Sequence, residues 1–273
     1  MKNVLVYGGD LRSVYMAEYI GSLGYEVTLG GHEVAIDDKE FQSDVIILGL
    51  PAVKNGMVYA PRSKETLSFE EFLKLCRRGS FVAGGKFSDA NKDLACQYGV
   101  RLFDYARDEI FQVENAFYTA EGAVSVLISN TGRSLREQKV LVAGYGRISR
   151  ALCSMLMSLG CSVSVYARNP VARAWCQSRG IKALDDLDNM GLYDAVINTV
   201  PADIFTCEVL STVKGEAVVM DLSAAPGYVD KDVCAHLGIK LIYLPGLPLS
   251  SAPCSAGEAA ARAVLARVST EGK

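Results

Sequence analysis

Several kinds of residue that mark particular protein classes are scarce or absent in this sequence. It contains two histidines, His32 and His236, and neither stands in a pattern with zinc-ligand spacing. Its eight cysteines include no C-x-x-C pair, and scattered single cysteines are typical of small buried side chains in a reducing compartment. The sequence therefore predicts no metal site and no disulfide framework.

The composition also disfavours membranes and nucleic acids as partners. No apolar run approaches the length of a membrane span, and the N-terminus leads into the strand-like residues 4–6 without the apolar region of a signal peptide. A net charge of −3 gives no general attraction to nucleic acid or to anionic lipid. Half of the residues are apolar, as in globular chains. We expect a cytoplasmic globular protein.

What the sequence does contain is a dinucleotide-binding fingerprint. Residues 139–149 have the pattern of a buried strand, a glycine turn and a first helical turn, with Gly144, Gly146 and Ser149 at the Gly-x-Gly-x-x-Gly positions. Gly144 permits the tight turn, and Gly146 lets backbone N–H groups approach a pyrophosphate. The positive end of the following helix would face the phosphates. Serine is small enough to keep the helix close to the strand.

The next predicted strand, residues 162–166, indicates which dinucleotide is preferred. It is followed by Ala167 and Arg168, at the place where an acidic residue would bind the ribose of NAD. An arginine suits the 2′-phosphate of NADP, so NADP is favoured over NAD. Other turn residues follow later strands at the same sheet edge. The residues expected to bind the cofactor are Gly144, Gly146, Arg147, Ile148, Arg168, Asn198, Thr199, Pro201 and Asp221.

The first half of the chain repeats the start of the second half at an offset of 136 residues. Residues 4–6 and Gly8 align with residues 140–142 and Gly144, and the match extends through the next predicted helix and strand. In this copy Asp10 replaces the second fingerprint glycine, and its carboxylate would repel a pyrophosphate, so no nucleotide is assigned to it. The pattern predicts an α/β fold with two doubly wound parallel-sheet, Rossmann-like domains joined by a long helix.

The predicted domain limits follow from these patterns. Residues 1–118 form the substrate-side domain. Residues 119–250 form the NADP domain, which includes a connecting helix over 119–132, and residues 251–273 form a C-terminal helix that packs back on the first domain. Residues 104–117 show no clear period. Two Ser-x-x-Glu capping boxes are predicted, at Ser68 with Glu71 and at Ser255 with Glu258.

A further set of motifs runs along nearly the whole chain in a specific order. The set comprises Gly8-Gly9-Asp10 with Arg12, Arg107-Asp108 with Asn115, Thr119-x-Glu121-Gly122, the fingerprint, Ala167-Arg168, Asn198-Thr199-x-Pro201, Asp221-Leu222 with Pro226-Gly227, and Pro245-Gly246-Leu247-Pro248 with Ala252-Pro253. In this order the motifs resemble those of the A subunit of dipicolinate synthase, a family of spore-forming bacteria. Ser149 departs from the last fingerprint glycine.

The resemblance implies a reaction and partners. It implies NADP-dependent oxidation of a dihydropyridine dicarboxylate of the lysine pathway to dipicolinate during sporulation. It also implies an oligomer that includes a flavoprotein-like B subunit. Arginines hold carboxylates bidentately, so Arg12 and Arg107 are the first candidates for the substrate clamp, with Lys86 behind them. Glu121 is a candidate general acid or base, or alternatively a carboxylate that complements a helix N-terminus.

Two other functions stay open on the sequence alone. A dehydrogenase of another small acid, such as a 2-hydroxy acid, would share the architecture, but it generally needs a histidine paired with a carboxylate, and neither His32 nor His236 is convincingly placed. A non-catalytic NADP-binding subunit that senses redox state or supports a partner is the second alternative. The role of His32 is undetermined, and no neighbour in the sequence activates the thiol of Cys254.

Overall fold

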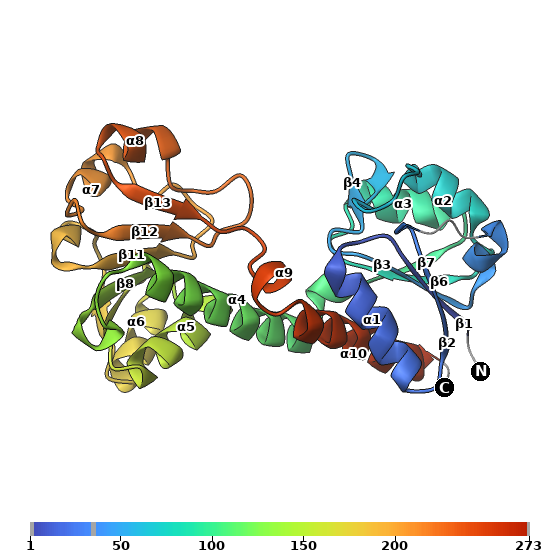
Figure 1. Ribbon diagram of the computed structural model, residues 1–273, viewed down its shortest axis with the longest axis horizontal. Helices are drawn as coiled ribbons and strands as arrows, with labels where there is room; N and C mark the ends of the chain where they lie inside the picture. The colour runs from blue at the N-terminus through green and yellow to red at the C-terminus, as the bar shows by residue number, and fades with distance from the viewer. Residues whose placement is uncertain (1–2, 34–36, 272–273) are drawn as a thin grey trace. The chain divides into compact units, whose positions relative to one another are not determined.

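The chain forms two compact units, each with its own sheet. The computed structural model describes residues 3–33 and 37–271, so the predicted outer limits at residues 1 and 273 lie outside the described residues. The first unit contains the residues up to Asn115 together with those from Ala252 onwards, and the second contains Ala116–Ser251. In each unit helices flank a parallel sheet, which confirms the predicted fold class (Figure 1).

The first unit has a five-stranded parallel sheet in the order β2-β1-β3-β6-β7. Helices α2 and α3 lie on one face, and α1 and α10 lie on the other. A short antiparallel pair, β4 and β5, follows β3. The bounds are β1 Asn3–Tyr7, α1 Leu11–Ser22, β2 Glu26–Gly30, β3 Val45–Leu48, β4 Val53–Lys54, β5 Met57–Val58, α2 Phe69–Leu75, β6 Phe81–Gly84, α3 Asp89–Gln97, β7 Arg101–Asp104 and α10 Pro253–Glu271.

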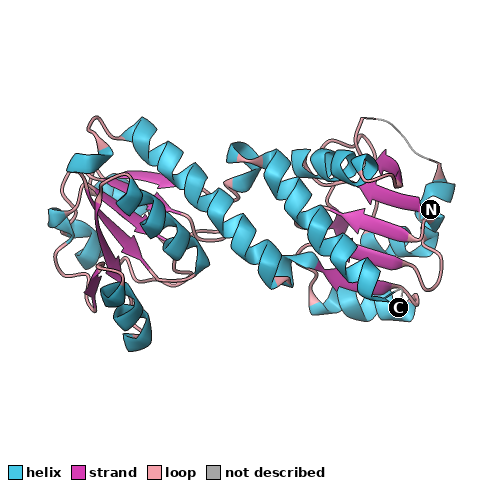
Figure 2. Cartoon of the chain, turned by 90° about the horizontal axis from the view of Figure 1, so that it is seen from below, coloured by secondary structure: helices cyan, strands magenta, loops and turns pink. Residues whose placement is uncertain are grey.

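The second unit has a six-stranded parallel sheet in the order β10-β9-β8-β11-β12-β13. Helices α5 and α6 lie on one face and α7 and α8 on the other, and Figure 2 shows the strands of each sheet side by side. The bounds are β8 Lys139–Ala143, α5 Arg147–Ser158, β9 Ser162–Tyr166, α6 Pro170–Ser178, β10 Lys182–Leu184, β11 Ala195–Asn198, α7 Cys207–Ser211, β12 Val218–Asp221, α8 Lys231–His236, β13 Lys240–Tyr243 and α9 Pro248–Ser251.

The central strands are apolar because both of their faces are covered. Every residue of β3, β6, β11 and β12 is buried. Such continuous runs of Val, Ile and Leu, without polar alternation, are what a parallel sheet between two helical layers requires. Polar side chains therefore gather where the strands end, at the carboxyl edge of each sheet.

Helix α4 (Glu109–Asn130) is longer than predicted. The prediction of a helix over 119–132, preceded by a segment without period, was wrong at its start. The Asp108 side chain accepts a hydrogen bond from the backbone N–H of Phe111 (2.9 Å), which caps the helix ten residues earlier than expected. Ile110 (72% exposed) and Phe117 (48% exposed) are apolar residues outside the core, so the buried stripe that marks a helix was obscured.

One predicted capping box is confirmed and the other is wrong. Ser68 and Glu71 form the reciprocal bonds at the start of α2. Helix α10 instead begins at Pro253, so Ser255 lies inside it. Proline suits a first helical turn because it has no N–H to leave unsatisfied, and Glu258 contacts Arg262 (3.7 Å) one turn on. The Ser-x-x-Glu spacing recurs inside helices by chance, and proline is the stronger start signal here.

Gly257 sets how closely α10 packs against α1. A Cβ atom at this position would lie 2.3 Å from the Arg12 carbonyl oxygen and 3.1 Å from the Met16 backbone nitrogen. We expect Gly257→Ala to lower the free energy of unfolding by about 1–3 kcal/mol, because backbone atoms cannot move aside cheaply. Chemical denaturation of the purified chain measures this change.

Gly21 of α1 provides a matched control for Gly257. It is also helical, but a Cβ there would meet nothing within 4 Å. Gly21→Ala should stabilise the chain by about 0.5–1 kcal/mol through helix propensity. If both substitutions changed the free energy of unfolding by the same amount, the close contact of Gly257 with α1 would be contradicted.

Candidate functional site

The first fingerprint glycine turns the chain sharply between β8 and α5. Gly144 has φ +94°, and its N–H donates to the Tyr166 carbonyl (2.8 Å) at the end of β9. A Cβ at Gly144 would lie 2.7 Å from Oγ1 of Thr199 and 2.9 Å from Cγ2 of Val200. Both the backbone conformation and the packing therefore exclude any other residue.

The second fingerprint glycine has no such neighbours. Gly146 precedes α5 with φ −83°, and a Cβ there would meet no atom of the chain within 4 Å. Gly146 makes no side-chain cap at the start of α5, whose first turn begins with Arg147 and Ile148, and a helix N-terminus of this kind can receive an anion. This open, positively polarised turn fits the pyrophosphate of a dinucleotide.

Ser149, in the third fingerprint position, is a buried link as well as a small residue. Its Oγ lies 2.7 Å from Oγ1 of Thr199, and the Thr199 hydroxyl donates to the Ala143 carbonyl (2.7 Å). Because the Thr199 proton is used in that bond, Ser149 donates to Thr199. The chain of hydrogen bonds joins α5, β11 and β8 directly beneath the turn, so serine here does more than replace glycine.

A cavity of about 650 Å³ opens beside the glycine turn. Its lining residues come from the turn, from the end of β9 with the residues after it, and from α6 and the end of β11: Gly144, Tyr145, Tyr166, Ala167, Arg168, Asn169, Ala172 and Val200. The Arg168 side chain is exposed. The structure thus brings Gly144 and Arg168, predicted from separate motifs, to one cavity.

Tyr145 lines the same cavity and was not predicted from the sequence. Its ring lies under the Arg150 guanidinium (5.4 Å to the centroid), and its hydroxyl accepts a hydrogen bond from Arg179 (3.2 Å). The two cations add positive charge to this end of the unit. Tyr145 occupies the unspecified position between the glycines, so the fingerprint carries no signal for it.

Asn198 and Asp221 are placed at neighbouring strand ends but are engaged within the chain. The buried Asp221 carboxylate accepts four hydrogen bonds of 2.7–3.1 Å, from the Asn198 side chain and from the backbone N–H groups of Ser223, Tyr228 and Val229. The side-chain oxygen Oδ1 of Asn198 accepts a hydrogen bond from the Val200 N–H (2.9 Å). Both side chains hold loops of the site edge in place, and direct cofactor contact by either stays a prediction.

Two other predicted residues of this unit lie apart from the cavity lining. Pro201 is exposed on the loop after β11. Glu121 is exposed on α4, where it lines a groove of about 530 Å³ with residues of α4 and α5, among them Val124, Ile128 and Met155. This groove and the cavity beside the glycine turn share no lining residue, so the structure does not bring Glu121 to the glycine turn.

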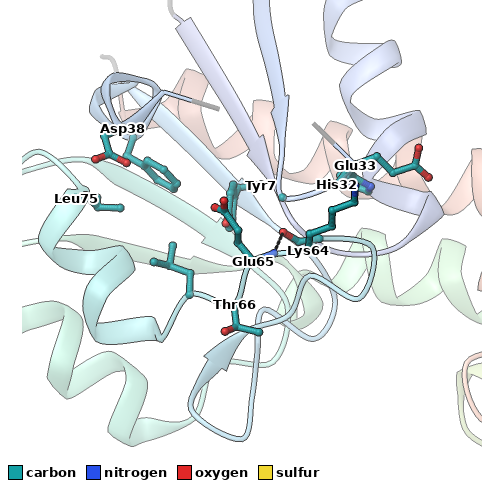
Figure 3. A pocket seen from close by; sticks show the side chains of 12 residues that line it. Tyr7, His32, Glu33, Asp38, Lys64, Glu65, Thr66 and Leu75 are labelled. Carbon is teal, nitrogen blue, oxygen red and sulfur yellow. Dashed lines mark hydrogen bonds between the residues drawn. The ribbon is translucent and has the colours of Figure 1, made fainter. Parts of the chain in front are cut away.

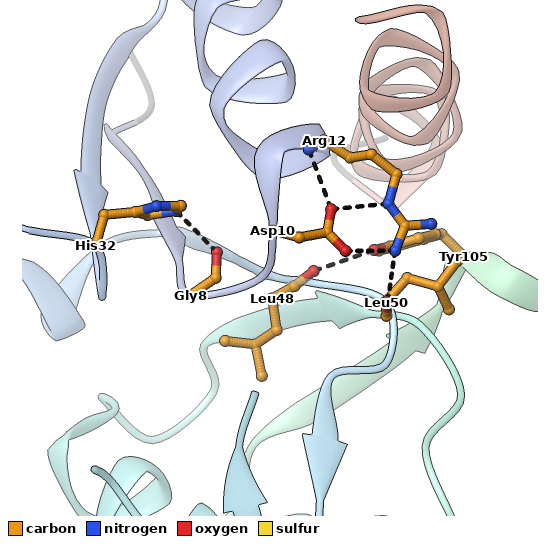
Figure 4. A network of polar contacts seen from close by, with 7 residues as sticks. All are labelled: Gly8, Asp10, Arg12, His32, Leu48, Leu50 and Tyr105. Atoms are coloured by element: carbon orange, nitrogen blue, oxygen red, sulfur yellow. Dashed lines mark hydrogen bonds and ion pairs between the residues drawn. The ribbon is translucent and has the colours of Figure 1, made fainter. Parts of the chain in front are cut away.

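In the first unit, Arg12 is held by its own turn. Its Nε and Nη2 donate to the two carboxylate oxygens of Asp10 (2.9 and 2.7 Å), and Nη2 also donates to the Leu50 carbonyl (2.7 Å). Asp10 additionally caps α1 by accepting from the Arg12 N–H (3.1 Å). Figure 4 shows this network beside the Tyr105 hydroxyl, which donates to the Leu48 carbonyl (3.2 Å).

This network changes what is expected of Arg12. Its side chain is 15% exposed, and the bidentate edge of the guanidinium is filled by Asp10. The adjoining cavity of about 10 Å³ has room for little more than one water molecule. Arg12 thus stabilises the turn. A contact between Arg12 and the substrate stays a prediction, and the space beside the guanidinium is smaller than such a contact was expected to have.

The other two cations of the first unit are more accessible. Arg107 is 69% exposed, and its Nε lies 3.5 Å from the Asp104 carboxylate. Lys86 is exposed directly after β6, with φ +62° and its N–H donating to Asp104 (2.9 Å). Both follow strands at the carboxyl edge of this sheet.

In the parts of the chain that the structure describes, six cysteine thiols have a raised pKa, those of Cys76, Cys153, Cys161, Cys176, Cys234 and Cys254. Burial raises the pKa of Cys76 and of Cys153 to about 12. Local desolvation, and next the Glu258 carboxylate, raise the pKa of the Cys254 thiol. Within residues 3–33 and 37–271, no group of three or more His, Cys, Asp or Glu side chains is arranged to hold a metal ion. No helix there has the length and apolar character needed to span a bilayer.

Two family models match the chain, one in each half. Residues 3–106 match the N-terminal domain of the dipicolinate synthase A subunit. Residues 111–243 match the NAD binding domain of D-isomer specific 2-hydroxyacid dehydrogenases.

Relatives over the full length agree with the first match. The dipicolinate synthase A subunit of Bacillus subtilis (strain 168) is 28% identical, covering 93% of this chain and 92% of its own length. The crystal structure of the dipicolinate synthase A subunit from Bacillus halodurans superposes with a TM-score of 0.87 at 25% identity, covering 98% of this chain and 97% of that chain. The crystal structure of its counterpart from Bacillus subtilis gives 0.85 at 25% identity, covering 99% and 96%.

Over nearly its full length the chain is similar to dipicolinate synthase A subunits. The resemblance seen in the sequence motifs is confirmed. The second unit is a nicotinamide-cofactor domain of the dehydrogenase type, and the chain is an oxidoreductase.

The open space at Gly146 makes a clean test of the cofactor position. Gly146→Val should leave the fold and the melting temperature unchanged, because nothing in the chain occupies the Cβ position. The branched side chain should instead exclude the pyrophosphate and abolish dinucleotide binding, as measured by calorimetry.

Gly215→Val serves as the control, since Gly215 is also exposed, has no neighbour within 4 Å and lies away from the turn. It should bind the dinucleotide like the unaltered chain. Undiminished binding by Gly146→Val would place the cofactor elsewhere.

Proposed function

We propose that this chain oxidises a dihydropyridine dicarboxylate to dipicolinate with NADP as the hydride acceptor, as the A subunit of a two-component enzyme in sporulating cells. The observation that carries the proposal is the full-length similarity to dipicolinate synthase A subunits. The open glycine turn beside Arg168 supports it. The name of these relatives also supports a partner subunit, which we infer to be the flavoprotein-like B subunit.

NADP is proposed over NAD because of the charge at the end of β9. Arg168 stands where an acidic residue would accept bonds from the ribose of NAD, and it lines the cavity beside the turn. Arg150 and Arg179, gathered at Tyr145, add to the positive potential nearby. A dianionic 2′-phosphate is stabilised by such a field, whereas a ribose hydroxyl gains little from it.

The proposed oxidation requires the substrate ring to be positioned against the cofactor more than it requires a strong base. The cofactor supplies the hydride acceptor, and the substrate loses one hydride and one proton as its ring becomes aromatic. The tasks left to the chain are to hold the two carboxylates and to keep the ring in place. We propose Arg107 as the first carboxylate ligand and Lys86 as the second, because both are exposed at the strand ends whereas Arg12 is bound by Asp10.

Glu121 stays a candidate general acid or base, although its position does not favour that role. Its carboxylate is exposed in a groove lined by Val124, Ile128 and Met155, and that groove is separate from the cofactor cavity. Its alternative role as a carboxylate that complements a helix N-terminus lacks support as well, because Glu121 lies in the middle of α4.

The alternative of a 2-hydroxy acid dehydrogenase has one observation in its favour, the family match of residues 111–243. It generally needs a histidine paired with a carboxylate. His236 is exposed in the last turn of α8, and His32 contacts the Gly8 carbonyl (3.2 Å) in the first unit. Neither lines the cofactor cavity, so the dihydropyridine substrate is preferred.

The purified chain, alone and with the B subunit, tests the function. NADPH should appear when the dihydropyridine dicarboxylate and NADP are supplied, and dipicolinate should form in equal amount. Oxidation of 2-hydroxy acids instead would favour the alternative enzyme. Binding of NADP without turnover of either substrate, with or without the B subunit, would indicate a scaffold role.

Arg168→Asp should reverse the cofactor preference. The carboxylate would repel the 2′-phosphate and accept bonds from the ribose hydroxyls of NAD. We expect NADP affinity to fall by about ten- to a hundred-fold, which corresponds to the loss of a charge-assisted bond, while NAD affinity rises. Calorimetry with both dinucleotides measures this. Equal binding of both by the unaltered chain would refute the assignment of Arg168.

Arg107→Ala should impair substrate use without affecting the cofactor. Loss of one charge-assisted clamp predicts a fall in kcat/KM for the diacid of about ten- to a hundred-fold, with unchanged NADP affinity. Arg107→Lys should recover part of the lost kcat/KM, because an ammonium group keeps the positive charge but not the bidentate geometry of the guanidinium. Lys92→Ala, at an exposed ion pair on α3, is the control. If Arg107→Ala behaves like this control, Lys86 becomes the better candidate.

A further inference from the structure

The first unit contains a cavity of about 170 Å³ at the sheet edge where its β1 and β2 end. Its lining residues come from those two strand ends, from residues 38–41 and 63–67, and from Leu75. Figure 3 shows Tyr7 and Glu65 near the middle, with Asp38 and Leu75 on one side and His32, Glu33 and Lys64 on the other. No step of the proposed oxidation uses this cavity.

The cavity lies at the position that corresponds to the cofactor cavity of the second unit. At the offset of 136 residues, Gly31, His32 and Glu33 match Ala167, Arg168 and Asn169, which line the second cavity. The backbone matches as well, because the Gly8 N–H donates to Gly30 (2.9 Å) as the Gly144 N–H donates to Tyr166 (2.8 Å). In dinucleotide-binding sheets this is the place of the adenosine half.

The phosphate part of that site is closed in the first unit. Asp10 stands where Gly146 stands in the second unit, and its carboxylate caps α1 and binds Arg12. The cavity lining carries three carboxylates, on Glu33, Asp38 and Glu65, against the ammonium group of Lys64, and Arg62 outside the lining lies 3.5 Å from the Glu33 carboxylate. An anionic ligand would meet like charge at both places.

The cavity walls suit a flat ring that donates hydrogen bonds. Tyr7 and Phe41 form an aromatic pair (5.1 Å between centroids) that lines it together with Leu75. A dry cavity of about 150 Å³ holds one benzene ring, so a cavity of about 170 Å³ has room for the flat ring system of a base and not for an attached sugar as well. Glu65, which lies near Tyr7 in Figure 3, supplies hydrogen-bond acceptors.

His32 adds a further acceptor. Its Nε2 faces the Gly8 carbonyl (3.2 Å), which can only accept, so this nitrogen carries the proton. Burial lowers the pKa of His32, which favours the neutral ring with Nδ1 as an acceptor.

We propose that this first-unit cavity binds the uncharged heterocycle of a purine base or nucleoside, without a phosphate. The amino and ring N–H groups of adenine supply the donors that Glu65 and His32 accept. The site is distinct from the dinucleotide site and does not depend on the reaction proposed above.

The test uses ligand-observed saturation-transfer NMR on the full-length Gly146→Val chain, in which the dinucleotide site is closed. The probes are adenine, adenosine and AMP. Adenine and adenosine should receive saturation from the protein, and AMP should bind at least about ten-fold more weakly than adenosine because of the carboxylates and Asp10. Absence of transfer to both adenine and adenosine, or equal binding of AMP, would overturn the proposal.

A second pair of variants locates the binding. Thr66 is exposed at the cavity, so the Thr66→Trp chain should fold normally. The tryptophan should fill the cavity and weaken the binding of adenosine by about ten-fold or more. Gln97→Trp introduces the same side chain at an exposed position of α3 that does not line the cavity, and it should leave binding unchanged. Adenosine binding that Thr66→Trp leaves intact would refute this location. Because no substrate or turnover is involved, failure of the oxidation assay leaves this result unaffected.

Discussion

The contact of the Gly144 turn with Thr199 is the constraint on which the second unit's site depends. The turn has no room for a Cβ because Thr199 and Val200 lie against it. Thr199 in turn is held by the Ala143 carbonyl and by Ser149. The position of the α5 N-terminus, and with it the donors that a pyrophosphate needs, follows from this packing.

A second layer of buried hydrogen bonds keeps the strand ends in register around that turn. The Asp221 carboxylate accepts four hydrogen bonds. Three come from N–H groups of the loop from Ser223 to Val229, and one comes from the Asn198 side chain. A buried charge is tolerated there because each oxygen receives two bonds. Arg168 and Tyr145 take no part in these bonds and line the cavity beside the turn.

The two units show how one backbone pattern takes two chemistries. Both have a glycine turn whose first N–H bonds to the end of the neighbouring strand. In the second unit Gly146 leaves the helix N-terminus open, and in the first unit Asp10 closes it and recruits Arg12. A single side chain thus converts an anion site into an internally satisfied turn, since a fixed carboxylate provides the negative charge that a phosphate would bring.

Local patterns predicted the elements well where one short-range signal dominated. The strand before the glycine turn and the strand over residues 162–166 were predicted from local pattern, and the α2 capping box from Ser68 with Glu71. The start of α4 was missed because exposed apolar residues hid its period. The start of α10 was misplaced because a Ser-x-x-Glu spacing inside the helix was read as a cap.

The amino-acid sequence by itself determined the two Rossmann-like folds, the glycine turn and the resemblance to dipicolinate synthase A subunits. The turn depends on residue spacings within about ten residues, and the two folds and the resemblance depend on a repeat and on a motif order that can be read along the chain without its tertiary structure. Only the tertiary structure decided that Arg12 is bound by Asp10 and Leu50, that Asp221 braces a loop, and that His32 and Glu65 line one cavity. Those outcomes join residues from different strand ends. A side chain's remaining hydrogen-bonding capacity is known only when its distant neighbours are in place.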